Sequence, residues 1–116
     1  MSTAYVVLGD PDVLLAELCP IDEQGHLLFC FAGRSRKPSS HSGLLDGPVE
    51  FKDYVMEGFA SYTLSAERVD NGLRLVVSQA DTTDRGAAVL WFVEKYLKSK
   101  GLTVSKSAVQ VGESDH

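Results

Sequence analysis

Hydrophobic and polar residues alternate most clearly in the second half of the chain. Within Ala60 to Val69, apolar side chains fall on every second residue as far as Ala66, and the same period of two returns from Leu73 to Val77. Alternation of this kind is typical of strands that bury one face. The intervening Asp70-Asn71-Gly72 contains Asn-Gly, a strong hairpin signal because both residues tolerate a positive φ. The segment therefore predicts an antiparallel hairpin.

A helical period replaces this alternation toward the C-terminus. Asp81, Thr82 and Asp84 offer capping oxygens and negative charge, so we expect a helix that begins near Thr82 or Thr83 and ends at Gly101. One apolar stripe follows the spacing i, i+3, i+4, i+7, i+8 and consists of Val89, Phe92, Val93, Tyr96 and Leu97. The stripe predicts that this helix packs on a sheet.

The first half of the chain is apolar in blocks. Ala4 to Leu8, Val13 to Cys19 and His26 to Ala32 are hydrophobic at almost every position, which predicts three strands, the last two paired as a hairpin. Gly33 to Gly47 is rich in Gly and Ser and predicts a mobile surface loop. Pro48 to Phe59 fits a short helix or an irregular strand, and Pro48 at its start favours the helix.

Together these elements predict an α+β fold class, with a mainly antiparallel sheet of about five strands and one long C-terminal helix packed on one face. Leu102 to Val104 and Ala108 to Val111 are two further stretches that can add a short edge strand. The length and the composition predict a single domain over residues 1–111, followed by a disordered tail over residues 112–116.

The net charge is negative and its distribution is uneven. The 116 residues include 11 Lys and Arg against 16 Asp and Glu, which gives a net charge of −5. No Lys or Arg precedes residue 33, whereas Arg34, Arg36 and Lys37 follow close together. We therefore expect a patched surface, and the overall charge argues against nonspecific attraction to a polyanion.

Two features predict a cytoplasmic protein without membrane contact. The sequence has neither an apolar run of membrane-spanning length nor a basic segment followed by an apolar signal region. Cys19 and Cys30 lie inside apolar runs, which suits buried, reduced thiols.

The familiar signatures of catalysis and of cofactor binding are missing from the sequence. Cys19, His26, Cys30 and His41 have the residue types of a zinc site but not its close spacing. Neither a G-x-S-x-G nucleophile turn nor a Walker or G-x-G-x-x-G phosphate loop is present. We therefore expect no catalytic, cofactor or metal site of a known motif.

Trp91 departs from the pattern of its own helix. At about 100° per residue, it points roughly 160° away from the stripe centred on Val93. An exposed Trp with Lys95 one turn away is typical of a protein interface, where a rigid aromatic side chain supplies much of the binding energy. The alternative is that residues 102–111 fold back and cover the indole, and the sequence leaves both open.

These features predict a small acidic protein-binding regulator or inhibitor, and they favour this function over an enzyme. Immunity proteins, antitoxins and phage inhibitors offer an analogy in size and charge. The acidic residues would meet and occlude a basic partner surface, while apolar groups supply affinity. The predicted contact residues are Trp91, Lys95, Asp10, Asp12, Asp22, Glu23, Asp46, Glu50, Asp53, Arg34, Arg36 and Lys37. A second copy of the chain is a further candidate partner.

Two other functions stay open. The first is a ligand-binding or catalytic domain whose pocket uses Tyr5, Tyr54 and Tyr62. The second is a nucleic-acid adaptor that uses the basic loop over residues 33–43, although the net charge makes nucleic acid the less favoured partner.

Overall fold

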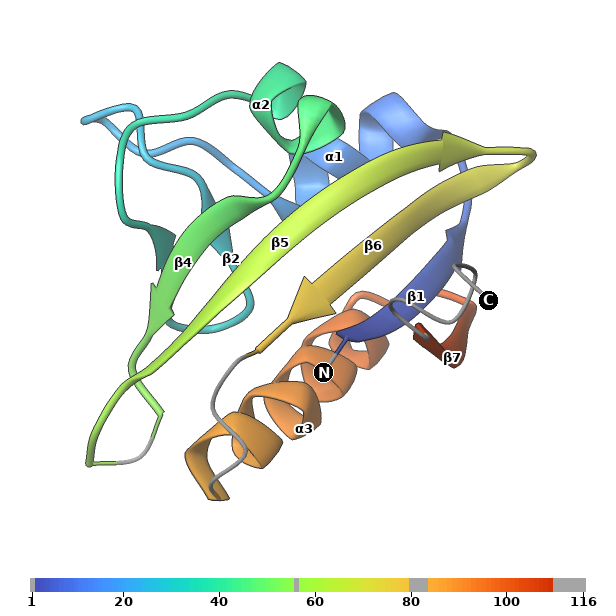
Figure 1. Ribbon diagram of the computed structural model, residues 1–116. Coiled ribbons are helices and arrows are strands. Elements are labelled where there is room, and N and C mark those ends of the chain that lie inside the picture. The colour runs from blue at the N-terminus through green and yellow to red at the C-terminus, as the bar shows by residue number, and fades with distance from the viewer. Residues whose placement is uncertain (1, 56, 80–83, 110–116) are drawn as a thin grey trace, which may run out of the picture.

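A curved antiparallel sheet of seven strands is the main feature of the computed structural model (Figure 1). The structure describes residues 2–55, 57–79 and 84–109. The strands are β1 (Ser2–Leu8), β2 (Leu28–Phe29), β3 (Gly33–Ser35), β4 (Val49–Asp53), β5 (Ala60–Val69), β6 (Gly72–Ser78) and β7 (Val104–Val109), and the helices are α1 (Pro11–Leu18), α2 (His41–Asp46) and α3 (Asp84–Ser99). The strand order is β2-β3-β4-β5-β6-β1-β7, and each neighbouring pair is antiparallel. The predicted sheet of about five strands with one helix is therefore wrong.

One hydrophobic core joins one face of the sheet to the three helices. Figure 1 shows α1 and α2 behind one end of the long β5–β6 hairpin and α3 beneath the other end. The hydroxyl of Tyr96 on α3 donates a hydrogen bond to the carbonyl oxygen of Leu18 on α1, at 2.8 Å. We call the side of the sheet that faces this core the covered face, and the opposite side the outer face.

The hairpin predicted around Asn71 is confirmed, but the role of Gly72 differs from the prediction. Val69 pairs with Gly72, so the turn consists of Asp70 and Asn71, and Asn71 has a φ of 61°. Gly72 is the first residue of β6 and has no positive φ. A Cβ at Gly72 would collide with the carbonyl oxygen of Val7 on β1, so close packing of the neighbouring strand requires glycine here.

The predicted C-terminal helix is confirmed as α3 over Asp84–Ser99. Four members of the expected stripe are buried, and Phe92 at its edge is partly buried. The predicted capping residues Asp81 and Thr82 lie outside the described residues. Gly101 has a φ of 72°, which suits a glycine that follows the end of a helix.

The strand predicted from Val13 to Cys19 is wrong, because this segment forms α1. The Asp10 carboxylate accepts hydrogen bonds from the backbone N–H groups of Asp12 (2.9 Å) and Val13 (3.3 Å), and Pro11 occupies the first helical turn. An Asp cap followed by Pro favours helix initiation, since Pro has no N–H to leave unpaired. Leu14, Leu15 and Leu18 then enter the core. The expected pairing of Val13–Cys19 with His26–Ala32 is consequently absent.

The predictions for residues 26–59 also need correction. Only Leu28–Phe29 of the expected strand over His26–Ala32 is a strand, β2, and it forms a hairpin with β3. The expected mobile loop from Gly33 to Gly47 contains β3 and α2, whose first turn is capped by the Ser40 hydroxyl. Residues 48–59 were expected to favour a helix, but Val49–Asp53 forms β4. Its side chains alternate, since Phe51 and Asp53 point toward the core and Lys52 points to the outer face.

An edge strand is present as predicted, but with other bounds: β7 is one continuous strand that joins the two predicted stretches and pairs with β1 from Val7–Val104 to Ser2–Val109. The predicted disordered tail over residues 112–116 lies outside the described residues. Among the helices described here, none is long and apolar enough to cross a membrane.

Candidate functional site

Trp91 lies on the side of α3 that faces away from the core. Its side chain is 54% exposed, as the position of Trp91 on the helix predicts. Phe92 meets the indole edge to face, with the ring centroids 4.8 Å apart, and Lys95 places its Nζ 4.8 Å from the indole centroid. We call Trp91, Phe92 and Lys95 the α3 surface. The Lys95 contact holds the indole through a cation–π interaction but leaves more than half of it open to a partner.

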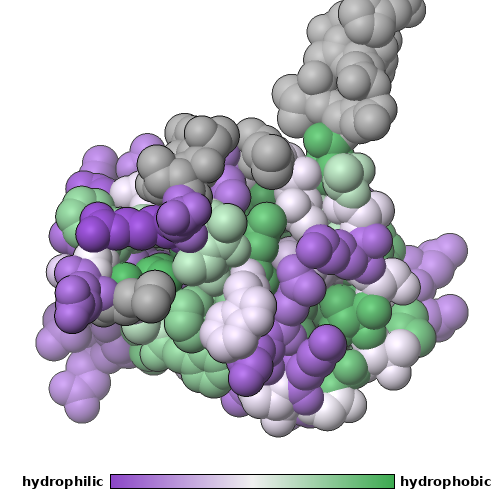
Figure 2. Space-filling view, turned by 90° about the horizontal axis from the view of Figure 1, so that it is seen from below, coloured by the Kyte–Doolittle hydropathy of each residue, from purple (hydrophilic) through white to green (hydrophobic). Residues whose placement is uncertain are grey.

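The C-terminal segment does not cover the indole within the residues described. Residues 104–109 pair with β1 as β7, so the alternative prediction fails for this part of the segment; residues 110–111 lie outside the described residues. Figure 2 views the molecule from below, where α3 lies, and shows two areas of apolar and near-neutral residues with hydrophilic residues between and around them. Phe31, in the turn between β2 and β3, is also exposed and lies edge-on to Tyr96 of α3, at 5.5 Å.

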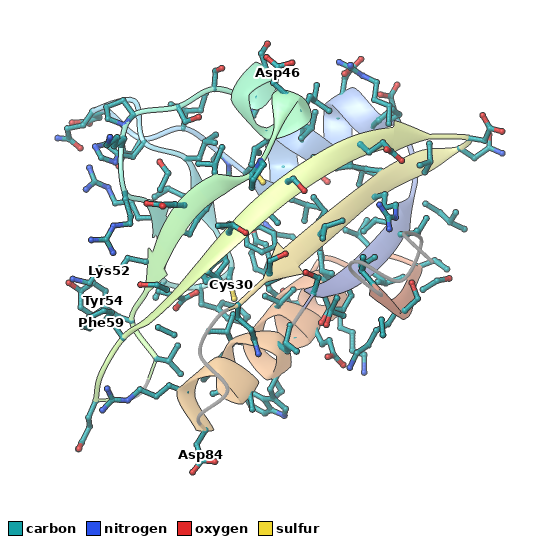
Figure 3. All side chains as sticks on the ribbon, viewed as in Figure 1. Cys30, Asp46, Lys52, Tyr54, Phe59 and Asp84 are labelled. Atoms are coloured by element: carbon teal, nitrogen blue, oxygen red, sulfur yellow. The ribbon has the colours of Figure 1, made fainter. Side chains whose placement is uncertain are left out.

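The acidic residues predicted as partner contacts do not form one surface. Asp10 caps α1, Asp12 forms an ion pair with Arg68 at 2.8 Å, and Asp22 forms one with Arg34 at 2.8 Å. The hydrogen bond from Arg34 is the main cause that lowers the pKa of Asp22. Glu23, Asp46 and Glu50 are exposed, and Figure 3 shows Asp46 on α2 at the opposite end of the molecule from Asp84 of α3.

Asp53 is buried instead of forming part of the surface. Only 3% of it is exposed, and its carboxylate lies on the covered face beside the Tyr62 hydroxyl. Both groups lie against Gly33, where a Cβ would collide with the Tyr62 hydroxyl. Burial raises the pKa of Asp53 to about 6, while the nearby Tyr62 hydroxyl acts in the opposite direction. Burial likewise raises the pKa of the neighbouring Cys30 thiol to about 12, so this thiol is a poor nucleophile.

The three tyrosines proposed for a ligand pocket are not brought together. Tyr5 on β1 is fully buried and donates a hydrogen bond to Glu94 of α3 at 3.2 Å. Tyr62 lies on β5, two strands away, and stacks on Phe51 with the ring centroids 5.5 Å apart. Tyr54 follows β4 and is exposed. A single pocket cannot use all three.

His26 and His41 each donate a hydrogen bond to a backbone carbonyl. Nδ1–H of His26 donates to the Ser35 carbonyl oxygen at 2.7 Å, and Nε2–H of His41 donates to the Cys19 carbonyl oxygen at 2.8 Å. In the described part of the chain, no group of three or more His, Cys, Asp or Glu side chains is placed to hold a metal ion.

Lys52 and two aromatic residues lie beside the basic cluster of Arg34, Arg36 and Lys37, which the sequence did not indicate. Arg34 on β3 lies opposite Lys52 on β4, and both point to the outer face. Lys52 places its Nζ 5.2 Å from the ring centroid of Tyr54 and 4.3 Å from that of Phe59. The period of two across Val49–Asp53 would have indicated that Lys52 faces outward, but it could not indicate which aromatic residues lie beside it.

Comparison with protein-family models, with curated proteins and with solved structures finds no match to this chain.

Proposed function

We propose that the chain is a protein-binding regulator that attaches to its partner through the α3 surface, with Trp91 as the anchor. The observation that carries this proposal is the 54% exposure of Trp91 on a helix that is already docked through four buried residues of its stripe. Docking of α3 therefore gives no reason for a large aromatic side chain on its outer side. Aromatic anchors of this kind supply a large share of the energy in protein interfaces.

The surroundings of Trp91 support binding to an apolar groove with a polar rim. Phe92 extends the aromatic surface, and Lys95 offers a cation at its edge. Binding would exclude other molecules from the partner's groove, so the regulator would act by occlusion. The net charge of −5 would speed the encounter with a partner that has a basic surface elsewhere. The rate of association should therefore fall as salt is added, and a rate independent of salt would remove this electrostatic part of the proposal.

Affinity capture with matched variants tests the proposal. Wild type, Trp91→Ala and Val13→Ala are immobilised, and proteins retained from an extract of the native cells are quantified by mass spectrometry. Val13 on α1 is 56% exposed, so its substitution removes a comparable exposed apolar residue from another surface. At least one protein should bind wild type and Val13→Ala alike and bind Trp91→Ala about 30-fold more weakly, which corresponds to about 2 kcal/mol.

Control measurements separate binding from folding. The free energy of unfolding of Trp91→Ala should stay within about 1 kcal/mol of wild type, because the substituted side chain is exposed. If the retained protein is a second copy of the chain, sedimentation should show a wild-type dimer and a monomeric Trp91→Ala variant. If Trp91→Ala retains every protein that wild type retains, the proposal is wrong.

A further inference from the structure

A second surface combines positive charge with exposed aromatic rings on the outer face. Three shallow depressions of about 220, 270 and 390 Å³ adjoin one another, and Arg36 lines all three. Lys52 and Tyr54 line the first, Ser61 and Thr63 the second, and Lys37 the third. We call these depressions, with the adjoining ring of Phe59, the outer-face surface.

The outer-face surface has more cations than acids. Arg34 is paired with Asp22, and Glu50 lines two of the depressions. Arg36, Lys37 and Lys52 have no ion-pair partner among the residues that the structure describes. The surface is thus locally positive on a chain of negative net charge, and an anionic ligand is the complementary one.

Exposed rings next to these cations narrow the class of ligand. Tyr54 is 64% exposed and Phe59 46% exposed, with their ring centroids 6.5 Å apart. Figure 3 shows both rings and Lys52 together beside the end of β4, pointing outward. Lys52 lies over both rings, and the exposed surface of Tyr54 is available for stacking. Cations beside open aromatic rings suit a chain of phosphates that carries flat, unpaired bases.

The shape of the surface favours an extended ligand over a compact one. Enclosed small-molecule pockets measure roughly 300 to 1,000 Å³. The depressions of about 220 and 270 Å³ are smaller than that, and the third, of about 390 Å³, lies at the lower end of the range. A chain that runs past Arg36 can occupy all three depressions in turn. An acidic peptide would use the cations but would have no need of the two rings. The bases of a duplex are stacked on one another and leave no free face for Tyr54, so a single strand fits this surface better than a duplex.

We infer that the outer-face surface binds single-stranded nucleic acid, with Arg36, Lys37 and Lys52 on the backbone phosphates and Tyr54 stacked on a base. Ser61 and Thr63 provide hydroxyl groups that can donate to the same phosphates. The negative net charge opposes this binding at long range, so the affinity should be modest and strongly dependent on salt. The inference does not depend on the α3 surface.

Fluorescence anisotropy with a labelled oligothymidine of about ten nucleotides tests this inference. Saturable binding at low salt should weaken with a slope near −2 in a plot of log K against log salt concentration, as expected for about three phosphate contacts on a single strand. The double variant Arg36→Ala/Lys52→Ala should lower the magnitude of this slope. Tyr54→Ala should weaken binding about 5-fold or more, and Tyr54→Phe, which keeps the ring, should bind like wild type.

Matched controls distinguish this site from general charge effects and from the proposed function. Lys98→Ala removes an exposed cation from α3, and Trp91→Ala removes the proposed protein anchor; both should bind the oligonucleotide like wild type. Several results would overturn the inference: no saturable binding, equal binding of a duplex of the same length, or an unchanged affinity in Tyr54→Ala. Displacement of the oligonucleotide by an equal concentration of oligoglutamate would assign the surface to an acidic peptide instead.

Discussion

The two faces of the sheet use alternate residues of the same strands for different purposes. On β5, Tyr62 and Leu64 point into the core, whereas Ser61 and Thr63 line a depression on the outer face. On β4, Phe51 is fully buried and the adjacent Lys52 lies beside two exposed rings. On either strand, therefore, a residue that stabilises the fold is next to a residue that is free to contact a ligand.

The largest difference between the faces should appear in a pair of neighbouring substitutions. Leu64→Ala removes a fully buried side chain and should lower the free energy of unfolding by about 2 to 5 kcal/mol, because the vacated space cannot fully collapse. Thr63→Ala, one residue away on the outer face, should lower it by about 1 kcal/mol or less, because Ala is less favourable than Thr in a strand. Denaturant unfolding measures both values. Similar losses for the two variants would contradict the assignment of the faces.

Asp53 places a carboxyl group on the largely apolar covered face. Its substitution should have a smaller effect on the free energy of unfolding, and one of opposite sign. Its folded-state pKa of about 6 lies above the value of about 3.9 expected in the unfolded chain. The folded state therefore holds a proton that the unfolded chain releases, so this group makes the protein less stable as the pH rises from about 4 to 6. Asp53→Asn should stabilise the protein by about 1 to 2 kcal/mol at pH 8, and this gain should vanish near pH 4.

Equilibrium unfolding at several pH values measures the effect of Asp53→Asn. Asp46→Asn is the matched control because it removes an exposed carboxylate from the end of α2. The control should stay within about 0.5 kcal/mol of wild type throughout. A destabilised Asp53→Asn variant at pH 8 would show that the folded protein needs the charged carboxylate.

The second half of the fold could be predicted because local patterns and tertiary packing agree there. The alternation in β5 and β6 and the stripe of α3 each match the face that the structure buries. In the first half they disagree. Val13–Cys19 is apolar enough for a buried strand, but the Asp10 cap and Pro11 in the first turn make it a helix.

The candidate sites were predictable to different degrees for a similar reason. The exposure of Trp91 follows from helical geometry alone, since the angle between residues is the same in every helix. The outer-face surface depends on a contact between Lys52 and Phe59, seven residues later in the sequence, which the pairing of β4 with β5 creates. The burial of Asp53 beside Tyr62 also depends on this pairing, so the composition of residues 46–57 wrongly placed Asp53 among the surface acids.

The most direct test of the proposed function uses Trp91 itself as the probe. The chain has one Trp, so incorporation of 5-fluorotryptophan gives a single ¹⁹F resonance that reports on this position. Addition of the partner captured from the native cells should shift or broaden this resonance. Excess unlabelled wild type should restore the original signal, and excess unlabelled Trp91→Ala should not. A resonance that stays unchanged while the partner binds would contradict the account, because the contact would then lie away from the α3 surface.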